Sequence, residues 1–539
     1  MTLPQSESPL TQSPVEYDFH FNPTQYTGDD GLYLLHSAIA IGASHDSIER
    51  SPPPRCHPQT RKVVFEIILA WTKNAIRGPR IMWVHGEGGS GKSAISQTVA
   101  EYCAHSRQLG ASFFFAHNRG DLSNGRLLFP TIAYKLASTI PGLRAPMSRA
   151  IQADTSILTQ SLEVQVQKLI IEPFRMVRHP PTPTLIVIDG LDACEDAEMQ
   201  HRILTLIGQL VVIHRLPLCF FITSRMQPAI QATFDSPVFR KVSARIPLDV
   251  FISHDDIRTF LCSEFAGIRQ YHAPAMVGIP DPWPSADVIE LLVHKSGGRF
   301  LYPSTVVKYV DDPRGRPAER LVEVVVAAAS PPDALADPQS SLDELYHHIL
   351  SGGGDPAALL RALGPLAMLY TPLPQHELEL LLGASRGELT LALDGVRALV
   401  DLPQSPAHCA RVAQTSTTEF LTDLPRALQF WVDAGAHHAV LARGCIRYLV
   451  EYLDGAEDVN LAMYQYVRRM WTKHLANASP VPPLLEELCE PRFVFSRMPY
   501  EVKAVIAWLQ SIPNVPAELL CLWQGWQAEM QSSSAFYVT

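Results

Sequence analysis

The sequence has no paired cysteine motif, no long basic block and no excess of positive charge. Its nine cysteines include no CxxC pair, and the pair Cys56-His57 has no partner pair at zinc-ligand spacing, so a structural zinc site is excluded. Lysine and arginine number 44 against 54 aspartates and glutamates, a formal charge of −10. The electrostatic footprint of a dedicated nucleic-acid binder is therefore missing, and we expect no direct nucleic-acid partner.

Signals for a membrane or for secretion are also missing. The longest apolar stretch, residues 210–222, is interrupted by His214, Arg215 and Pro217, so it is too short and too polar to span a bilayer. The amino-terminal residues have neither the basic region nor the apolar core of a signal peptide. We expect no membrane span and a cytoplasmic protein with reduced cysteines.

The sequence does have enough apolar residues to fill several cores. Of its 539 residues, 47% are hydrophobic and 18% are charged, which favours three or more folded domains. No fixed-period repeat is present, so a solenoid or a propeller is not supported. Residues 1–30 are rich in Ser, Thr, Pro and Gln, and we expect a disordered tail there.

Residues 31–79 form a lead-in that ends in a predicted helix. Its sequence is RKVVFEIILAWTKNAI, with Thr60 placed to cap it. Val63, Ile67, Ile68 and Trp71 are predicted to share the buried face, because they recur at helical spacing.

Residues 80–250 alternate between apolar runs of strand length and longer stretches with helical period. The predicted strands are RIMWVHG, GASFFFAH, TLIVIDG, LPLCFFITS and KVSARIPLDV. Near-continuous apolar strands that alternate with helices indicate an α/β fold, a parallel five-stranded sheet with flanking helices on both faces. The run Phe113-Phe114-Phe115 is interpreted as core strand, not as a stacking platform for bases.

Beyond residue 250 the pattern is helical almost throughout. Short strand-like pieces are predicted near residues 398–401 and 409–413, and residues 426–539 read as helices. The cluster Arg468, Arg469, Lys473 and His474 is interpreted as a solvated helix face, with an anion-binding patch as the alternative.

The stretch WVHGEGGSGKSAIS contains the pattern G-x-x-x-x-G-K-[ST] between a predicted strand and a predicted helix. Successive backbone N–H groups wrap a phosphate chain only where side chains are absent, and the start of the following helix directs its positive dipole end at the anion. The sequence therefore predicts an ATP or ADP site with Mg²⁺. The expected nucleotide contacts in this loop are Gly86, Glu87, Gly88, Gly89, Ser90, Gly91, Lys92, Ser93 and Ala94.

Two other predicted strands end in polar residues that suit the same chemistry. TLIVID ends in Asp189, which we expect on a strand beside the loop, sharing Mg²⁺ with Ser93. Asp192, three residues later, is the candidate that orients an attacking water. FFITSR places Ser224 and Arg225 at the end of another strand, where the guanidinium is the candidate sensor or stabiliser of a γ-phosphate.

In order along the chain, these motifs resemble those of the NACHT group of signal-transducing P-loop ATPases, the STAND class, in the form common in fungal NOD-like receptor proteins. The segments that carry the resemblance are HGEGGSGKSAISQTVAEYC, ASFFFAHN, LIVIDGLDACED, FFITSR, DIRTFLCSEFAGI, SGGRFLYPSTVVKYV, SLDELYHHIL and HHAVLARGCIRYL. The resemblance implies a nucleotide-binding domain over residues 80–250, a helical lid over 251–329, a winged-helix domain over 340–425 and a helical domain over 426–539. It also implies a switch in innate immunity: a closed ADP form opens on exchange for ATP and self-associates, and slow hydrolysis resets it.

Three positions depart from the family pattern. Ala193 stands where an acid usually follows DGLD, so orientation of water depends on Asp192 or Glu195. Gln414 stands where a winged-helix histidine often touches the β-phosphate, with Glu419 at the acid position of the same stretch. Phe300 replaces the proline of the lid motif. The alternatives to a switch are a degenerate scaffold that binds nucleotide without turnover and a small-molecule kinase; the upstream sensor and the downstream effector are not readable.

Overall fold

The structure is a computed structural model that describes most of the chain beyond the amino-terminal tail. The described residues are 30–75, 78–117, 119–177, 184–194, 196–312, 315–328, 338–402, 409–453, 460–490, 493 and 499–534. The tail predicted over residues 1–30 lies outside them except for Asp30, which begins helix α1 (Asp30–His36). Glu195, one of the two candidates for orienting water, also lies outside them.

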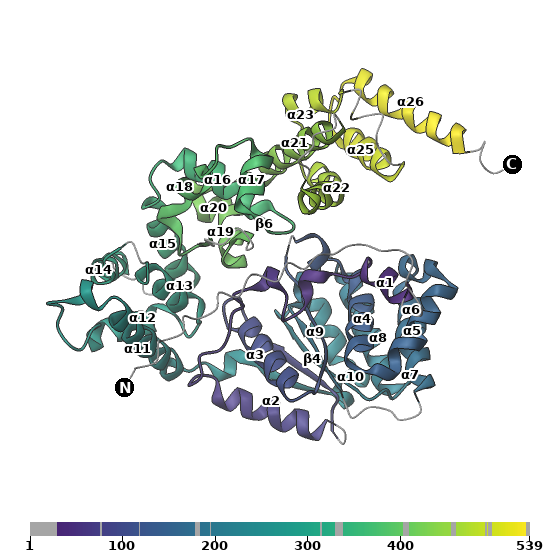
Figure 1. Ribbon diagram of the computed structural model, residues 1–539. Coiled ribbons are helices and arrows are strands. Elements are labelled where there is room, and N and C mark those ends of the chain that lie inside the picture. The colour runs from purple at the N-terminus through teal and green to yellow at the C-terminus, as the bar shows by residue number, and fades with distance from the viewer. Residues whose placement is uncertain are drawn as a thin grey trace, which may run out of the picture.

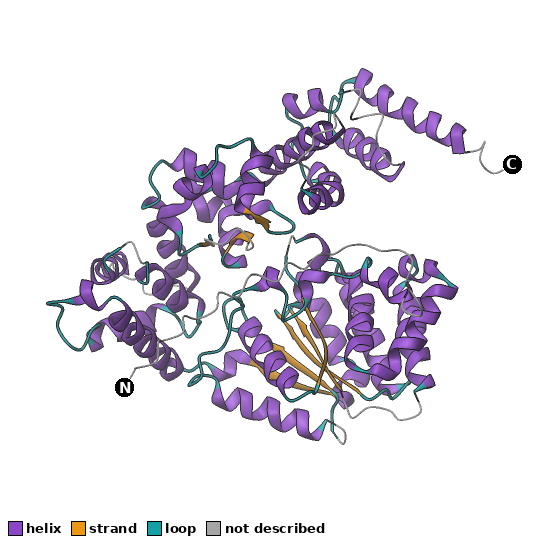
Figure 2. Ribbon diagram, viewed as in Figure 1, coloured by secondary structure: helices purple, strands orange, loops and turns teal. Residues whose placement is uncertain are grey.

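A five-stranded, fully parallel sheet forms the centre of the amino-terminal half, which we call the α/β core (Figure 2). The strands are β1 (Ile81–His85), β2 (Leu109–Phe114), β3 (Thr184–Asp189), β4 (Leu218–Ser224) and β5 (Ser243–Pro247). Their order across the sheet is β2-β3-β4-β1-β5. The predicted fold class and all five predicted strands are confirmed, because long apolar runs are what a sheet covered on both faces requires.

The pleat of the strands divides their side chains between two separate hydrophobic cores. Trp83 and Val84 are neighbours in β1, yet Trp83 packs into one core and Val84 into the other. One face of the sheet is covered by α2 (Lys62–Asn74) and α3 (Lys92–His105). The other face is covered by α1, α4 (Leu128–Thr139), α5 (Pro141–Ala153), α6 (Leu162–Val166), α7 (Glu172–Met176), α8 (Ala197–Val212), α9 (Pro228–Asp235) and α10 (Pro237–Val242).

Helix α2 forms where it is predicted, but it turns a different face to the sheet. Val64, Ile68 and Trp71 are buried, whereas Val63 and Ile67 are exposed. The predicted face was displaced: α2 contacts the sheet along the stripe of Val64, Ile68 and Trp71, and the neighbouring apolar positions face solvent. The predicted cap is also wrong, because the Thr60 hydroxyl donates to the carbonyl of His57.

The carboxyl-terminal half consists of helices and one small sheet, and it lies along one side of the α/β core (Figure 1). The α11–α14 bundle contains α11 (His254–Tyr271), α12 (Ala286–Lys295), α13 (Leu301–Val310) and α14 (Pro317–Ala328). The α15–α20 unit contains α15 (Pro338–Ser351), α16 (Pro356–Met368), β6 (Leu373–Pro374), α17 (Gln375–Leu382), α18 (Glu388–Leu393), β7 (Val400–Asp401), β8 (Cys409–Val412), α19 (Thr415–Thr422) and α20 (Leu424–Ala427). The α21–α26 arm contains α21 (Ala434–Leu453), α22 (Leu461–Ala476), α23 (Pro482–Glu487), α25 (Pro499–Ser511) and α26 (Ala517–Ser534).

One continuous hydrophobic core joins these three parts. It runs from Ile257 in α11 to Trp526 in α26. The two predicted strand-like pieces are confirmed as β7 and β8, which pair antiparallel, and β6 adds a third short strand that the sequence pattern did not reveal. Among the described residues, no helix combines the length and the apolarity needed to cross a bilayer.

The interpretation of the basic cluster in α22 as a solvated face is wrong. Arg468 pairs with the fully buried Glu501, and His474 is itself fully buried. Arg469 and Lys473 reach Asp121 of the α/β core at 3.1 and 3.3 Å. A charged helix face in the sequence does not reveal that another part of the chain covers it.

Candidate functional site

The loop between β1 and α3 has the backbone that its glycines predict. Gly89 and Gly91 have φ of +76° and +93°, a region that side chains disfavour. A Cβ on Gly89 would lie 2.7 Å from the Cβ of Leu301, so the first residue of α13 packs directly on the loop. Gly91 is the N-cap of α3, and the helix dipole therefore ends at this loop.

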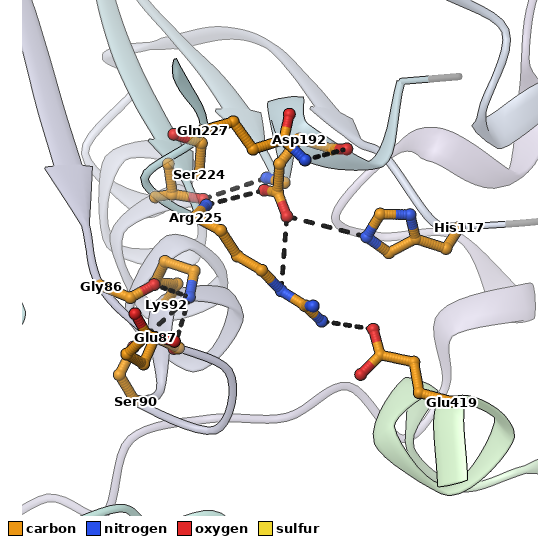
Figure 3. A network of polar contacts seen from close by, with 12 residues as sticks. Gly86, Glu87, Ser90, Lys92, His117, Asp192, Ser224, Arg225, Gln227 and Glu419 are labelled. Carbon is orange, nitrogen blue, oxygen red and sulfur yellow. Dashed lines mark hydrogen bonds and ion pairs between the residues drawn. The ribbon is translucent and has the colours of Figure 1, made fainter. Parts of the chain in front are cut away.

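Lys92 folds back over this loop (Figure 3). Its ammonium donates to the carbonyl oxygens of Gly86 and Glu87 at 2.7 and 2.8 Å, and lies 3.4 Å from the Ser90 hydroxyl. Burial lowers the pKa of Lys92, while Asp192 and Asp189 oppose this effect. The lysine is thus a desolvated cation held at the loop by backbone acceptors.

Asp189 lies at the carboxyl end of β3, buried among hydroxyl groups. Its Oδ1 accepts hydrogen bonds from Ser96 at 2.7 Å and from Thr223 at 2.6 Å. Thr223 in turn accepts from the backbone N–H of Gly190 at 3.0 Å. The prediction that the strand of Asp189 lies directly beside the loop strand is wrong, because β4 is inserted between β1 and β3. Helix α3 still brings the two together through Ser96.

Asp192 is also buried, and its carboxylate is shared between two basic groups (Figure 3). Its Oδ1 accepts from the backbone N–H of Arg225 at 2.9 Å, and its Oδ2 lies 3.5 Å from Arg225 Nε and 3.7 Å from His117 Nε2. Burial acts to raise the pKa of Asp192, but the hydrogen bonds from His117 and from the Arg225 backbone outweigh it and leave the pKa below its ordinary value. Asp192 is therefore held as a carboxylate.

Arg225 extends from the end of β4 toward the loop between β1 and α3 and toward the carboxyl-terminal half. A Cβ on Gly88 would lie 4.0 Å from its Cζ and Nη2. The same Nη2 donates to the carboxylate of Glu419 in α19. Residues 194 positions apart in the chain thus meet at the edge of the loop.

The predicted site residues Ser93 and Ser224 differ in how far their side chains are exposed. Ser93 is exposed in the first turn of α3, as a cation ligand at the loop requires. Ser224 is fully buried, and its hydroxyl accepts from Trp83 Nε1 at 2.9 Å. The Ser224 side chain thus faces the core beneath the site, and its assignment as a nucleotide contact stays a prediction.

Further contacts link the loop to the α11–α14 bundle. Arg61 donates to the carbonyl of Ser90 in the loop at 2.9 Å and to that of Phe251 at 2.7 Å. Its guanidinium lies 5.2 Å from the centre of the Phe300 ring. In the same region, Thr305 of α13 donates to the Gln414 side chain at 3.3 Å. The two departures Phe300 and Gln414 therefore both serve contacts between parts of the chain.

Sequence reasoning missed several residues of the site. Thr223 and His117 carried a usable signal, because each is a polar residue at the carboxyl end of an apolar strand. Ser96, Arg61 and Leu301 carried none, because each lies within or beside an ordinary amphipathic helix and is placed by packing.

The oxygen groups near the loop fit Mg²⁺ better than a softer metal. The described residues contain no group of three or more His, Cys, Asp or Glu able to hold a metal ion by themselves. Mg²⁺ needs only one or two protein oxygens when phosphates and waters supply the rest. The exposed Ser93 hydroxyl and the Asp189 carboxylate meet that requirement.

One family model matches the part of the chain that contains this site. The family is described as "Nephrocystin 3, N-terminal", and the match covers residues 65–225. The matched segment begins in α2 and ends at Arg225, so it includes β1 to β4, the loop, Asp189 and Asp192. No curated protein matches this sequence.

Solved structures give only loose overlays. A Signal Transduction ATPase with Numerous Domains (STAND) protein with a tetratricopeptide repeat sensor from Pyrococcus horikoshii is 12% identical, with a TM-score of 0.42. That overlay covers 88% of this chain and 62% of the archaeal protein, so this chain spans less than two thirds of its length. The Aeropyrum pernix ORC2 protein in its ADP form is 13% identical, with a TM-score of 0.26 over 67% of this chain and 92% of that chain.

Proposed function

We propose that this chain is a P-loop NTPase of the STAND class and a NACHT-type signalling switch that binds ATP or ADP with Mg²⁺. Exchange of ADP for ATP opens the chain and drives self-association, and slow hydrolysis resets it. The single observation that carries this proposal is the convergence of a glycine loop, a desolvated lysine, two buried carboxylates and an arginine at one edge of a parallel sheet.

The residues divide the work by position. Backbone N–H groups of the loop and the start of α3 hold the phosphates, and Lys92 exchanges its carbonyl partners for phosphate oxygens. Ser93 and Asp189 hold Mg²⁺, which neutralises phosphate charge when it is bound. Asp192, kept ionised by its partners, orients the attacking water, and Arg225 contacts the terminal phosphate. Turnover is expected below roughly one per second, under the usual enzyme range.

The division of the chain follows the same proposal. Residues 80–250 are the nucleotide domain, 251–329 the helical lid, 340–425 the winged-helix domain and 426–539 a helical domain. The contacts of Leu301 with Gly89 and of Glu419 with Arg225 support it, because the lid region packs on the loop and the winged-helix region bonds the arginine beside it. We place the protein in the cytoplasm, where nucleotide is available.

A degenerate scaffold that binds nucleotide without turnover is the second candidate. Ala193 is buried where the family has an acid, and both oxygens of Asp192 already have neighbouring N–H donors, the Arg225 backbone at Oδ1 and the Arg225 and His117 side chains at Oδ2. An attacking water therefore finds fewer free acceptor sites on the Asp192 carboxylate. Measuring phosphate release by the nucleotide-bound protein separates the two candidates.

The test of the proposed function compares the full chain with Lys92→Ala. Titration calorimetry with ADP and with a non-hydrolysable ATP analogue, both with Mg²⁺, measures affinity, and light scattering measures size. Loss of charge-assisted bonds to phosphate weakens affinity at least about tenfold. Lys168→Ala is the matched control, since Lys168 pairs with Glu172 on the far helices. Binding by the wild type with no loss in Lys92→Ala contradicts the assigned cradle.

A further inference from the structure

The Arg225 guanidinium lies near three groups that differ in burial and in the part of the chain they come from. It lies beside Gly88 of the loop, it is 3.5 Å from Asp192, and it bonds Glu419 of α19. Asp192 is buried and also bonded to the Arg225 backbone, so that contact belongs to the α/β core itself. Glu419 comes from another part of the chain and is the partner that can leave.

We propose that Glu419 sets the discrimination between nucleoside triphosphate and diphosphate, by holding the guanidinium that a terminal phosphate must recruit. This inference rests on the proposed function and adds a residue that it does not require. A phosphate and a carboxylate both accept two parallel N–H bonds from a guanidinium, so one replaces the other at Arg225 without leaving a donor unpaired.

The geometry makes the exchange specific to the third phosphate. In the proposed function the loop and the start of α3 hold the phosphates nearest the nucleoside, and Lys92 contacts the phosphate that follows them. Arg225 lies across the loop from Lys92, next to Gly88 (Figure 3). A diphosphate that fills the cradle leaves the Arg225–Glu419 pair intact, whereas a terminal phosphate competes with Glu419 directly.

The exposure of the pair suits a reversible contact. The side chains of Arg225 and Glu419 are 38% and 36% exposed. Separation therefore leaves both charges near water, without the penalty of a buried unpaired ion. When Arg225 turns to phosphate, α19 loses its ion pair with the α/β core beside the loop, so the exchange loosens the α15–α20 unit at the nucleotide.

The experiment measures affinities for Mg-ADP and for a Mg-bound non-hydrolysable ATP analogue in the full chain by titration calorimetry. Glu419→Gln removes the competing charge, so triphosphate affinity rises a few-fold, up to about fivefold, while diphosphate affinity stays unchanged. Glu163→Gln is the matched control, because its pair with Arg202 is similarly exposed and remote from the loop; it changes neither affinity.

A second variant keeps the test informative if Glu419→Gln folds poorly. Glu419→Ala removes the same carboxylate and favours the helical conformation of α19, so triphosphate affinity is expected to rise there as well while diphosphate affinity stays unchanged. An unchanged ratio of affinities in a wild-type-like Glu419→Gln overturns this inference alone. Failure of the wild type to bind either nucleotide overturns both this inference and the proposed function.

Discussion

The α15–α20 unit contacts the α/β core through two arginines in opposite ways. At the loop, Arg225 of the core reaches a carboxylate on α19, and both side chains are more than one third exposed. At the other contact, Arg411 of β8 donates to the backbone carbonyls of Glu49 and Pro52 at 2.7 and 3.1 Å and pairs with Asp401 at 2.9 Å. The Arg411 side chain is only 14% exposed.

This difference separates a fixed joint from a releasable one. Backbone carbonyls on the lead-in are held by the fold and have no anionic competitor, so nothing that binds at the loop replaces them. The Glu419 carboxylate is a partly exposed side-chain acceptor whose charge has the same sign as that of a phosphate. Under the proposed function, we expect this unit to move about the Arg411 contact when the Glu419 contact opens.

The largest effect on stability is expected for Arg411→Ala. It leaves two carbonyls and Asp401 without their guanidinium, and loss of a partly buried ion pair together with two charge-assisted hydrogen bonds costs about 3 kcal/mol of unfolding free energy. Urea denaturation measures the change. Arg202→Ala, which breaks an exposed pair with Glu163, is the control and is expected to cost less than about 1 kcal/mol. Equal losses in the two variants would remove the distinction between the joints.

A second large effect is expected from acid in the α21–α26 arm. His438 Nδ1 and His474 Nδ1 lie 2.9 Å apart inside it, and His474 Nε2 lies 2.8 Å from the Tyr466 hydroxyl. Burial lowers the pKa of His438 to about 4 and that of His474 well below its ordinary value. The unfolded chain therefore binds more protons than the folded one as pH falls below about 6.5, and stability declines toward pH 4.

At pH 5 the His438 shift alone corresponds to a loss of about 2 kcal/mol relative to pH 7. Thermal unfolding at the two pH values measures it. His438→Gln cannot gain the proton, so its drop between pH 7 and pH 5 is expected to be smaller. A drop as large as that of the wild type would show that protonation of His438 does not limit stability in acid.

An intermediate effect is expected at the contact between the arm and the core. Asp121 faces both Arg469 and Lys473 of α22, and its side chain is 24% exposed. Asp121→Asn removes two partly screened ion pairs, so we expect a loss of about 1 kcal/mol in thermal or urea unfolding. Faster limited proteolysis between the core and α22 would accompany it. A loss of unfolding free energy no greater than that of Glu163→Gln would show that this contact is releasable, like that of Glu419.

The smallest effect on stability is expected for Glu419→Gln. Its partly exposed ion pair contributes less than about 1 kcal/mol, so the unfolding midpoint stays close to that of the wild type while the nucleotide ratio shifts. A loss of unfolding free energy as large as that of Arg411→Ala would show that the Glu419 contact is a fixed joint and not a releasable one.

The features predicted well are those of local conformation, which depend only on nearby chain. Gly89 and Gly91 need only their own dihedral angles, and Asp189 needs only the strand that it ends. The features that the sequence did not reveal depend on contacts with other elements. The buried face of α2 depends on which stripe meets the sheet, and the burial of Ser224 depends on Trp83 in the adjacent strand.

The sequence by itself determined the parallel α/β core and the loop that precedes α3, because strand and helix periods and glycine freedom act over a few residues. Only the tertiary structure decided which side chains meet there: Ser96 and Thr223 on Asp189, Leu301 over Gly89, and Glu419 on Arg225. These contacts join elements far apart in the chain, and their partners follow from how whole units pack, which no local pattern encodes.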